Sequence, residues 1–259
     1  MRDQHSLHTK KSLGQHFLID KTVNDKIIHA AGAFADYNTV IEIGPGMGAL
    51  TEHILQESPQ NYWVVELDDR FVEYLPKKFP ALRDRIIHKD FLEVDLYQFQ
   101  ANLPLLMLGN FPYNISTQIM FKIIESRPIV AVMIGMFQKE VALRIASKHK
   151  QKDYGILSVL TQAYYDVEYL FDVPPASFNP PPKVDSGVLK IQLKPEDPIG
   201  FDYKKLKLVV KAAFNQRRKT LRNSMKGLNI QSPEFEKFTN LRPEQCSVED
   251  FIEMSRMIL

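Results

Sequence analysis

The sequence has one cysteine, Cys246, in 259 residues. A lone cysteine excludes a disulfide framework within the chain and a cysteine-rich zinc site, and it is typical of a reducing compartment. Long hydrophobic runs are also missing. The longest apolar stretch, near residues 129–137, is too short to span a bilayer, and residues 1–11 are polar and basic, unlike a secretion signal. We therefore expect a cytoplasmic protein without a membrane partner.

Acidic residues are absent from residues 203–226, where lysine and arginine occur nine times, although the net charge of the chain is only +2. Such a basic block is the usual footprint of a partner with a phosphate backbone, and a solvated helix face is the alternative. The pattern predicts a basic helix from Lys204 to Lys226, closed by Gly227. The side chains expected to contact such a partner are Lys211, Arg217, Arg218, Lys219 and Arg222.

The order of the predicted elements divides the chain into two domains. Apolar runs at residues 39–43, 62–65, 86–88, 103–108 and 129–136 predict strands of a parallel sheet, separated by helical patterns. Two further strands are expected at 164–171 and 187–193. Beyond Pro195 only helical patterns remain. We therefore expect an α/β domain over residues 1–195, with a flexible basic arm at 1–12, and a helical domain over residues 200–259 that carries the basic block and would bind its phosphate-backbone partner.

A glycine-rich loop follows the first predicted strand, in the form E-x-G-x-G-x-G from Glu42 to Gly48. Glycines between a strand and a helix allow the backbone to approach a ligand closely. The run also satisfies GxGxxA, so a nicotinamide or flavin dinucleotide site is one interpretation. Glu42, placed where a buried carboxylate would organise the loop, favours a different nucleoside cofactor.

Two acidic residues follow the next strands. Glu66 ends the second strand, twenty positions after Gly46, where an acid can bond the ribose hydroxyls of an adenosine ligand. Asp90 follows the third strand and can accept a hydrogen bond from the adenine amine of such a ligand. The alternative is that Asp90 is the N-cap of a helix. Asp68 and Asp69 are expected to be a solvated helix start.

The fourth strand leads into Asn110-Phe111-Pro112-Tyr113. These residue types suit alkylation of the exocyclic amine of a nucleobase, a poor nucleophile because its lone pair is delocalised. The Asn110 side-chain oxygen and a backbone carbonyl held by Pro112 can each accept an N–H of that amine, while Tyr113 provides a flat face for the base. An ordinary turn followed by a core aromatic is the alternative.

Residues 174–185 form a proline-rich loop that would hold Phe178 in a fixed place. With Tyr113, Phe178 would make two walls for an unstacked base, and stacking is worth roughly 1–3 kcal/mol per base. Filling a gap in the core is the alternative for Phe178.

Together these motifs resemble the ribosomal RNA adenine dimethyltransferases, specifically the bacterial branch that modifies small-subunit RNA. The matching runs are KKSLGQHFLID, EIGPGMGALT, GNFPYNIS, SFNPPPKVDSGV and FNQRRKTLRN, with Glu66 and Asp90 between them. The resemblance implies a Rossmann-like class I methyltransferase sheet followed by a small all-helical domain. It also implies dimethylation of N6 of two adjacent adenines in a hairpin loop near the 3′ end of that RNA.

The resemblance carries site residues onto this sequence. The S-adenosylmethionine site would comprise Gln15, His16, Leu18, Gly44, Gly46, Glu66, Asp90 and Asn110. The target adenine would be held by Asn110, Phe111, Pro112, Tyr113 and Phe178. The chemistry needs no metal, and the partner would be small-subunit ribosomal RNA, in a pre-assembled 30S-type particle, with the enzyme acting as a monomer.

Two positions depart from the family pattern. His16 stands where asparagine is more usual and adds a titratable group beside the cofactor. Phe111 replaces a smaller aliphatic residue and would narrow the pocket for an already methylated amine. Two rivals remain open: the sister group that methylates large-subunit RNA and confers macrolide resistance, and a non-catalytic RNA-binding protein on a methyltransferase scaffold.

Overall fold

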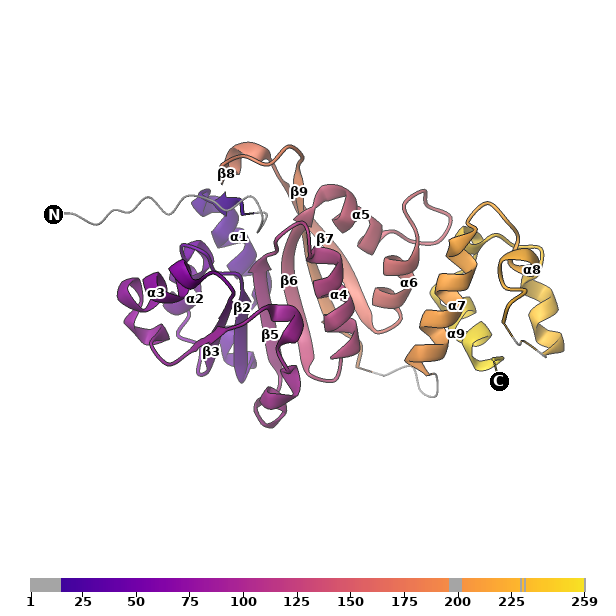
Figure 1. The fold of residues 1–259 in the computed structure, drawn as a ribbon, viewed down its shortest axis with the longest axis horizontal. Coiled ribbons are helices and arrows are strands. Elements are labelled where there is room, and N and C mark those ends of the chain that lie inside the picture. The colour runs from indigo at the N-terminus through magenta and orange to yellow at the C-terminus, as the bar shows by residue number, and fades with distance from the viewer. Residues whose placement is uncertain (1–14, 196–201, 229, 231, 259) are drawn as a thin grey trace. The chain divides into compact units, whose positions relative to one another are not determined.

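The structure, a computed structural model, describes residues 15–195, 202–228, 230 and 232–258. Its centre is a seven-stranded sheet with the order β4-β3-β2-β5-β6-β9-β7 (Figure 1). The first five strands in this order run parallel, and β9 pairs with β6 in the antiparallel sense. This arrangement confirms the predicted Rossmann-like α/β sheet. The strands are β2 (Thr39–Ile43), β3 (Tyr62–Glu66), β4 (Ile86–His88), β5 (Leu105–Asn110), β6 (Val130–Gln138), β7 (Tyr165–Val173) and β9 (Ser186–Leu193).

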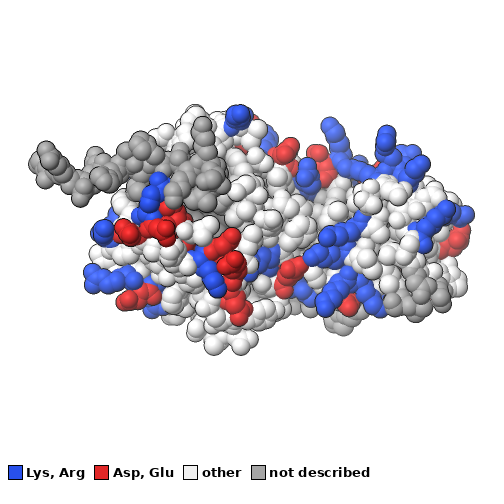
Figure 2. Space-filling model, viewed as in Figure 1, with Lys and Arg blue, Asp and Glu red and all other residues white. Residues whose placement is uncertain are grey.

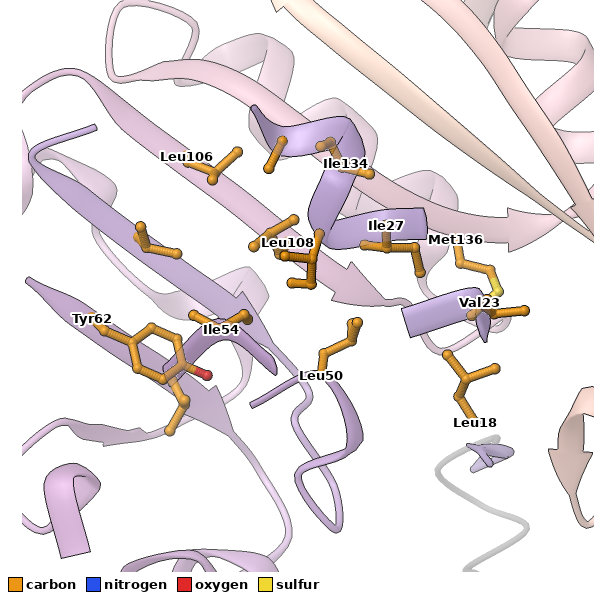
Figure 3. Packing of buried hydrophobic residues seen from close by; sticks show 14 of the residues in the cluster. Leu18, Val23, Ile27, Leu50, Ile54, Tyr62, Leu106, Leu108, Ile134 and Met136 are labelled. Atoms are coloured by element: carbon orange, nitrogen blue, oxygen red, sulfur yellow. The ribbon is translucent and has the colours of Figure 1, made fainter. Parts of the chain in front are cut away.

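The central strands are buried on both faces, as expected of a parallel sheet covered by helices. All five residues of β2 are buried, including the polar Thr39 and Glu42. Alternate residues such as Leu106 and Leu108 of β5 join one apolar cluster with side chains of α1, α2 and α3 (Figure 3). Burying such a side chain stabilises the fold by roughly 2 kcal/mol. The helices along this part of the chain are α1 (Lys21–Ala31), α2 (Ala49–Gln56), α3 (Asp69–Lys78), α4 (Ser116–Glu125) and α5 (Lys139–Ala146).

A second, two-stranded sheet joins segments that are far apart in the sequence. β1 (Phe17–Leu18) pairs antiparallel with β8 (Phe178–Asn179), so that Leu18 lies opposite Phe178. After β1, Asp20 caps α1 by accepting a hydrogen bond from the backbone N–H of Thr22 at 3.0 Å. The pairing ties the start of the described chain to the proline-rich loop.

The chain divides into two compact units: Met1–Ala142 with Glu168–Gln192, and Leu143–Val167 with Leu193–Leu259. The second unit therefore includes α6 (Ile156–Gln162), which precedes the last strands in the sequence. The predicted domain boundary between residues 195 and 200 stays a prediction. In the second unit the described residues beyond 202 form α7 (Tyr203–Asn215), α8 (Leu221–Ser224), the 3₁₀ helices η7 (Pro233–Phe238) and η8 (Pro243–Gln245), and α9 (Val248–Arg256).

The prediction of one basic helix from Lys204 to Lys226, closed by Gly227, was wrong. Helix α7 ends at Asn215, and α8 begins five residues after Gln216, at Leu221. The reason is tertiary: the backbone N–H of Leu221 donates to the carbonyl of Leu241 at 2.8 Å, instead of continuing the bonds of α7. The basic block is therefore a helix, a turn and a second short helix.

Candidate functional site

A cavity of about 530 Å³ lies in the first unit, where β2, β3 and β5 reach their carboxyl ends. Ligands of open α/β sheets bind at this edge. The cavity brings together every residue expected around the cofactor and four of the five expected around the target adenine. The expected residues that line it are Gln15, His16, Leu18, Gly44, Gly46, Glu66, Asp90, Asn110, Phe111, Pro112 and Tyr113.

The glycine-rich loop adopts the left-handed backbone that the glycine pattern requires. Gly44 has φ 64° and Gly46 has φ 54°, a region that residues with a Cβ seldom adopt. A Cβ on Gly44 would meet no atom within 4 Å, so the backbone there borders open space. The backbone N–H of Gly46 donates to Glu66 Oε2 at 3.1 Å, which connects the loop to the end of β3.

Glu66 is held in place by backbone donors. Its Oε1 accepts from the N–H groups of Leu67 and Asp68, both at 2.8 Å, and its Oε2 accepts only from Gly46 among the described residues. Burial raises the pKa of Glu66, and these three hydrogen bonds oppose that rise. A carboxylate oxygen accepts two hydrogen bonds, so Oε2 keeps one site for a ligand hydroxyl.

Glu42 lies behind the loop and is only 2% exposed. Its Oε2 accepts from Thr51 Oγ1 at 2.6 Å and from the hydroxyl of Tyr62. Burial raises the pKa of Glu42 to about 7. This carboxylate is buried as expected, and its partners show that it joins α2 to β3.

Asp90 is an N-cap, which was one of the two interpretations of this residue, and it also lies at the cavity. It caps the 3₁₀ helix η4 (Phe91–Glu93), where its Oδ1 accepts from the N–H of Leu92 at 2.9 Å, and it also borders the cavity. Behind η4, Lys122 of α4 donates to the carbonyl of Leu92 at 2.9 Å, and its Nζ lies 5.7 Å from the ring centroid of Phe91. Sequence patterns did not predict this support, because Lys122 lies 32 positions after Asp90.

Asn110 ends β5 and contacts a segment almost a hundred residues earlier. Its Nδ2 donates to the backbone carbonyl of His16 at 2.9 Å. A carbonyl can only accept a hydrogen bond, so the Asn110 atom bonded to it must be the amide nitrogen. The bond therefore fixes the orientation of the Asn110 amide and leaves its Oδ1 available to accept a hydrogen bond. His16 is in turn fixed, because its Nδ1 lies 2.9 Å from the carbonyl of Pro180 and must carry the proton there.

Tyr113 provides an aromatic wall at the same end of the cavity. Its ring centroid lies 5.6 Å from that of His16, and its hydroxyl forms a 2.5 Å hydrogen bond with Ser186 Oγ. Burial raises the pKa of Tyr113, so the phenol stays neutral. The Ser186 bond holds the hydroxyl end of the side chain in place.

Phe111 occupies space left by two glycines that the sequence analysis did not single out. Gly109 of β5 and Gly135 of β6 are paired neighbours in the sheet. A Cβ on either would lie 2.5 Å or 2.3 Å, respectively, from a carbon of the Phe111 ring. The ring also packs edge-to-face on Phe137 at 5.1 Å. The large Phe111 side chain therefore packs against the sheet, and it is only 1% exposed.

The structure does not bring Phe178 to the cavity. Phe178 is 3% exposed, belongs to the apolar cluster and lies opposite Leu18 in the small sheet. The structure thus agrees with the alternative, a side chain that fills the core, because strand pairing directs Phe178 inward. Asp68 also differs from expectation: it is 2% exposed and forms an ion pair with Arg70 at 2.5 Å, while Asp69 is the solvated residue.

The basic residues expected to contact RNA lie on the surface of the second unit. Arg222 pairs with Glu236 at 2.9 Å, and Arg217 donates to the carbonyl of Lys152 at 2.5 Å. Lys211, Arg218 and Lys219 are exposed. Figure 2 shows lysine and arginine side chains over the elements that Figure 1 labels α6, α7 and α8.

The described part of the chain has neither a cluster of metal-ligating side chains nor a membrane-spanning helix. Residues 15–195, 202–228, 230 and 232–258 contain no group of three or more histidine, cysteine, aspartate or glutamate side chains able to hold a metal ion. In the same residues, no helix is long and apolar enough to cross a membrane.

The chain is similar to proteins that modify ribosomal RNA. The family model for ribosomal RNA adenine dimethylase matches residues 6–258. The ribosomal RNA small subunit methyltransferase A of Cytophaga hutchinsonii is 46% identical over 254 residues, covering 96% of each chain. That of Flavobacterium johnsoniae is 49% identical over 250 residues, covering 96% of this chain and 95% of the relative.

Solved structures share the fold. A dimethyladenosine transferase from Plasmodium falciparum superposes with a TM-score of 0.76 at 23% identity, covering 92% of this chain and 96% of the other. The 23S rRNA methyltransferase ErmE superposes with a TM-score of 0.69 at 23% identity, covering 93% of this chain and 99% of the other.

Proposed function

Because the chain belongs to the ribosomal RNA adenine dimethylase family, we propose that it transfers methyl groups from S-adenosylmethionine to adenine N6 in small-subunit ribosomal RNA. Two methyl groups would be placed on each of two adjacent adenines in the 3′-terminal hairpin loop. The small-subunit assignment is supported by relatives with that printed name at 46% and 49% identity.

One observation carries the proposed chemistry: the bond from Asn110 Nδ2 to the His16 carbonyl at 2.9 Å. It leaves the Asn110 oxygen as an acceptor at the cavity, next to the aromatic face of Tyr113. An acceptor beside a flat wall is what an adenine amine requires, because the ring stacks while the N–H groups donate in its plane.

Other residues that line the cavity fit S-adenosylmethionine. Glu66 Oε2 retains an acceptor site suited to a ribose hydroxyl, Asp90 suits an adenine amine, and the open backbone at Gly44 admits close approach. When bound, the cofactor supplies an electrophilic methyl group on a sulfonium. Gln15, His16 and Leu18 line the same cavity and would complete the site.

The chain acts on the amine by orienting it. Asn110 Oδ1 and the carbonyl of Phe111 accept the two N–H groups, which draws the nitrogen lone pair out of conjugation with the ring. Pro112 restricts the backbone that carries this carbonyl. Tyr113 holds the base by stacking, so the acceleration comes chiefly from proximity and orientation, and the nitrogen gains a methyl group as it loses a proton.

Exposed cations of the second unit would hold the RNA by its phosphates. Lys211, Arg218 and Lys219 are exposed, and Arg217 and Arg222 contribute charge in the same block. The substrate would be a pre-assembled 30S-type particle in the cytoplasm, and the enzyme would act as a monomer.

Methyl transfer from labelled S-adenosylmethionine to unmethylated small subunits, with large subunits in parallel, tests the function. Nucleoside analysis should give dimethyladenosine in small-subunit RNA alone. Label in large-subunit RNA would assign the chain to the large-subunit branch. Failure to label either RNA, with RNA binding intact, would show a non-catalytic binding protein.

A further inference from the structure

Two largely exposed segments of the second unit are joined by a hydrogen bond. One is the loop at residues 147–155, between α5 and α6, and the other is the turn at residues 216–220, between α7 and α8. Arg217 Nη2 donates to the carbonyl of Lys152 at 2.5 Å, and the N–H of Lys150 donates to the carbonyl of Glu244 at 2.7 Å. These bonds fasten the loop to the C-terminal helices at two points.

Further bonds within the loop give it a defined shape. Gln151 Oε1 accepts from Ser147 Oγ at 3.1 Å and from the N–H of Lys148 at 2.7 Å. Lys150 has φ 69°, in the left-handed region that a lysine seldom adopts, so the surrounding bonds must hold it there. The lysine side chains of the loop are nevertheless all exposed.

The two segments together present a strongly basic surface. Its cations are Lys148, Lys150, Lys152, Arg217, Arg218 and Lys219. Nearby carboxylates include Asp153 in the loop and Glu244, whose Oε2 lies 4.0 Å from Arg217 Nε, and Glu249 and Asp250 act electrostatically on Tyr154 of the same loop. In the described part of the chain, no hydrogen bond or ion pair occupies the side-chain nitrogens of Lys148, Lys150, Lys152, Arg218 or Lys219.

We propose that the 147–155 loop binds the phosphate backbone of the RNA substrate jointly with Arg218 and Lys219. Exposed lysines on an ordered loop, unneutralised and close to further cations, are suited to phosphates, which lysine binds as point charges. Arg217 has a different function, because its guanidinium bonds the loop: it is a positioning residue. The inference rests on the proposed function, since it takes ribosomal RNA as the partner.

The double substitution Lys148→Gln/Lys152→Gln tests the loop. Binding of the full chain to in vitro transcribed small-subunit ribosomal RNA is measured against salt concentration. The slope of log affinity against log salt should fall by about 1.5, at 0.7–0.9 per lost phosphate contact. The KM for RNA should rise while kcat at saturating RNA stays within about twofold.

The matched control is Lys204→Gln/Lys207→Gln, which removes the same charge from the first turns of α7, about 15 Å of helix before the turn. It should leave the slope within about 0.5 of wild type. An unchanged slope in the loop variant, or equal losses in both variants, would overturn the inference. A wild-type chain that labels no ribosomal RNA would instead overturn the proposed function.

The function of Arg217 is tested by comparing Arg217→Gln with Arg218→Gln. Limited trypsin digestion should cut the 147–155 loop of Arg217→Gln about fivefold faster than wild type, because the loop has lost its anchor. In Arg218→Gln the loop should be cut at the wild-type rate, but the slope of log RNA affinity against log salt concentration should be reduced. Equal cutting rates in the two variants would show that Arg217 does not anchor the loop.

Discussion

Asn110 Nδ2 and the backbone carbonyl of His16 lie 2.9 Å apart, although 94 positions separate the two residues. This bond decides which atom of the Asn110 side chain meets the substrate, because the amide cannot rotate without losing its acceptor. It also connects the end of β5 to the segment before α1. A residue expected to bind the target amine, Asn110, is thereby held against a residue expected to line the cofactor site, His16.

Asn110→Ala should lower kcat at least about 100-fold, since one of two acceptors for the amine is lost. Asn110→Asp should lose similar activity despite its equal size, because a carboxylate cannot donate to the His16 carbonyl. RNA affinity should stay at the wild-type level in both variants. Turnover retained in Asn110→Ala would remove the function assigned to this side chain.

Phe111 and Gly135 should be energetically coupled. Gly135→Ala places a Cβ 2.3 Å from the Phe111 ring and should cost about 1–3 kcal/mol of stability. In the double variant with Phe111→Leu, the smaller side chain relieves the clash, so the two changes together should cost at least about 1 kcal/mol less than their sum. Urea unfolding of the four chains measures this, and strictly additive costs would contradict it.

Glu42 should make stability depend on pH. Its folded pKa of about 7 lies above the ordinary 4.5, so the folded chain holds this proton more tightly than the unfolded chain. The contribution of Glu42 to stability is therefore greatest below about pH 4.5, falls as pH rises to about 7 and then levels off.

Glu42→Gln keeps an oxygen that can accept from Thr51 and Tyr62 but cannot ionise. Relative to wild type, this variant should gain stability between pH 4.5 and 8, by up to about 3 kcal/mol. Urea unfolding across this range checks the difference between the two chains. Parallel pH profiles would show that Glu42 does not titrate there.

Lys122 should influence cofactor affinity without touching the cofactor. It supports η4 through the Leu92 carbonyl at 2.9 Å, and Asp90 is the N-cap of η4. Burial lowers the pKa of Lys122, while Asp95, Asp90 and Glu125 raise it. Lys122→Met should raise the KM for S-adenosylmethionine about fivefold with kcat nearly unchanged.

Lys77→Met, at an exposed position of α3, is the control and should leave this KM unchanged. Loss of kcat with no change in KM for Lys122→Met would mean that Lys122 affects the chemical step and not the adenine end of the site.

Local patterns predicted the elements of the sheet well. Residues 39–43 and 86–88 form strands as expected. All five residues of the first strand are buried between its neighbours, whereas 86–88 form an edge strand that is only partly buried. The cap at Asp20 was also predictable, since a cap depends on residues two positions apart. The fourth strand, in contrast, begins at Leu105 and continues to Asn110, two residues further than predicted, because its pairing with β6 continues to that point.

Contacts between distant segments were not predictable from local patterns. The interior position of Phe178 depends on its pairing with Leu18, and the break after Asn215 depends on a bond from Leu221 to Leu241. The position of the 147–155 loop beside Arg217 comes from a hydrogen bond between residues 65 positions apart.

The sequence alone therefore determined the chemistry available to this protein: a glycine loop, two carboxylates after strands, and an asparagine and a tyrosine around a proline. These follow from residue types and from spacings that a single strand or turn converts directly into position. Only the tertiary structure decided which atom of Asn110 faces the cavity, where the Phe111 ring lies and which cations share a surface. Those outcomes depend on strand register and on hydrogen bonds between distant segments, which no short stretch of sequence encodes.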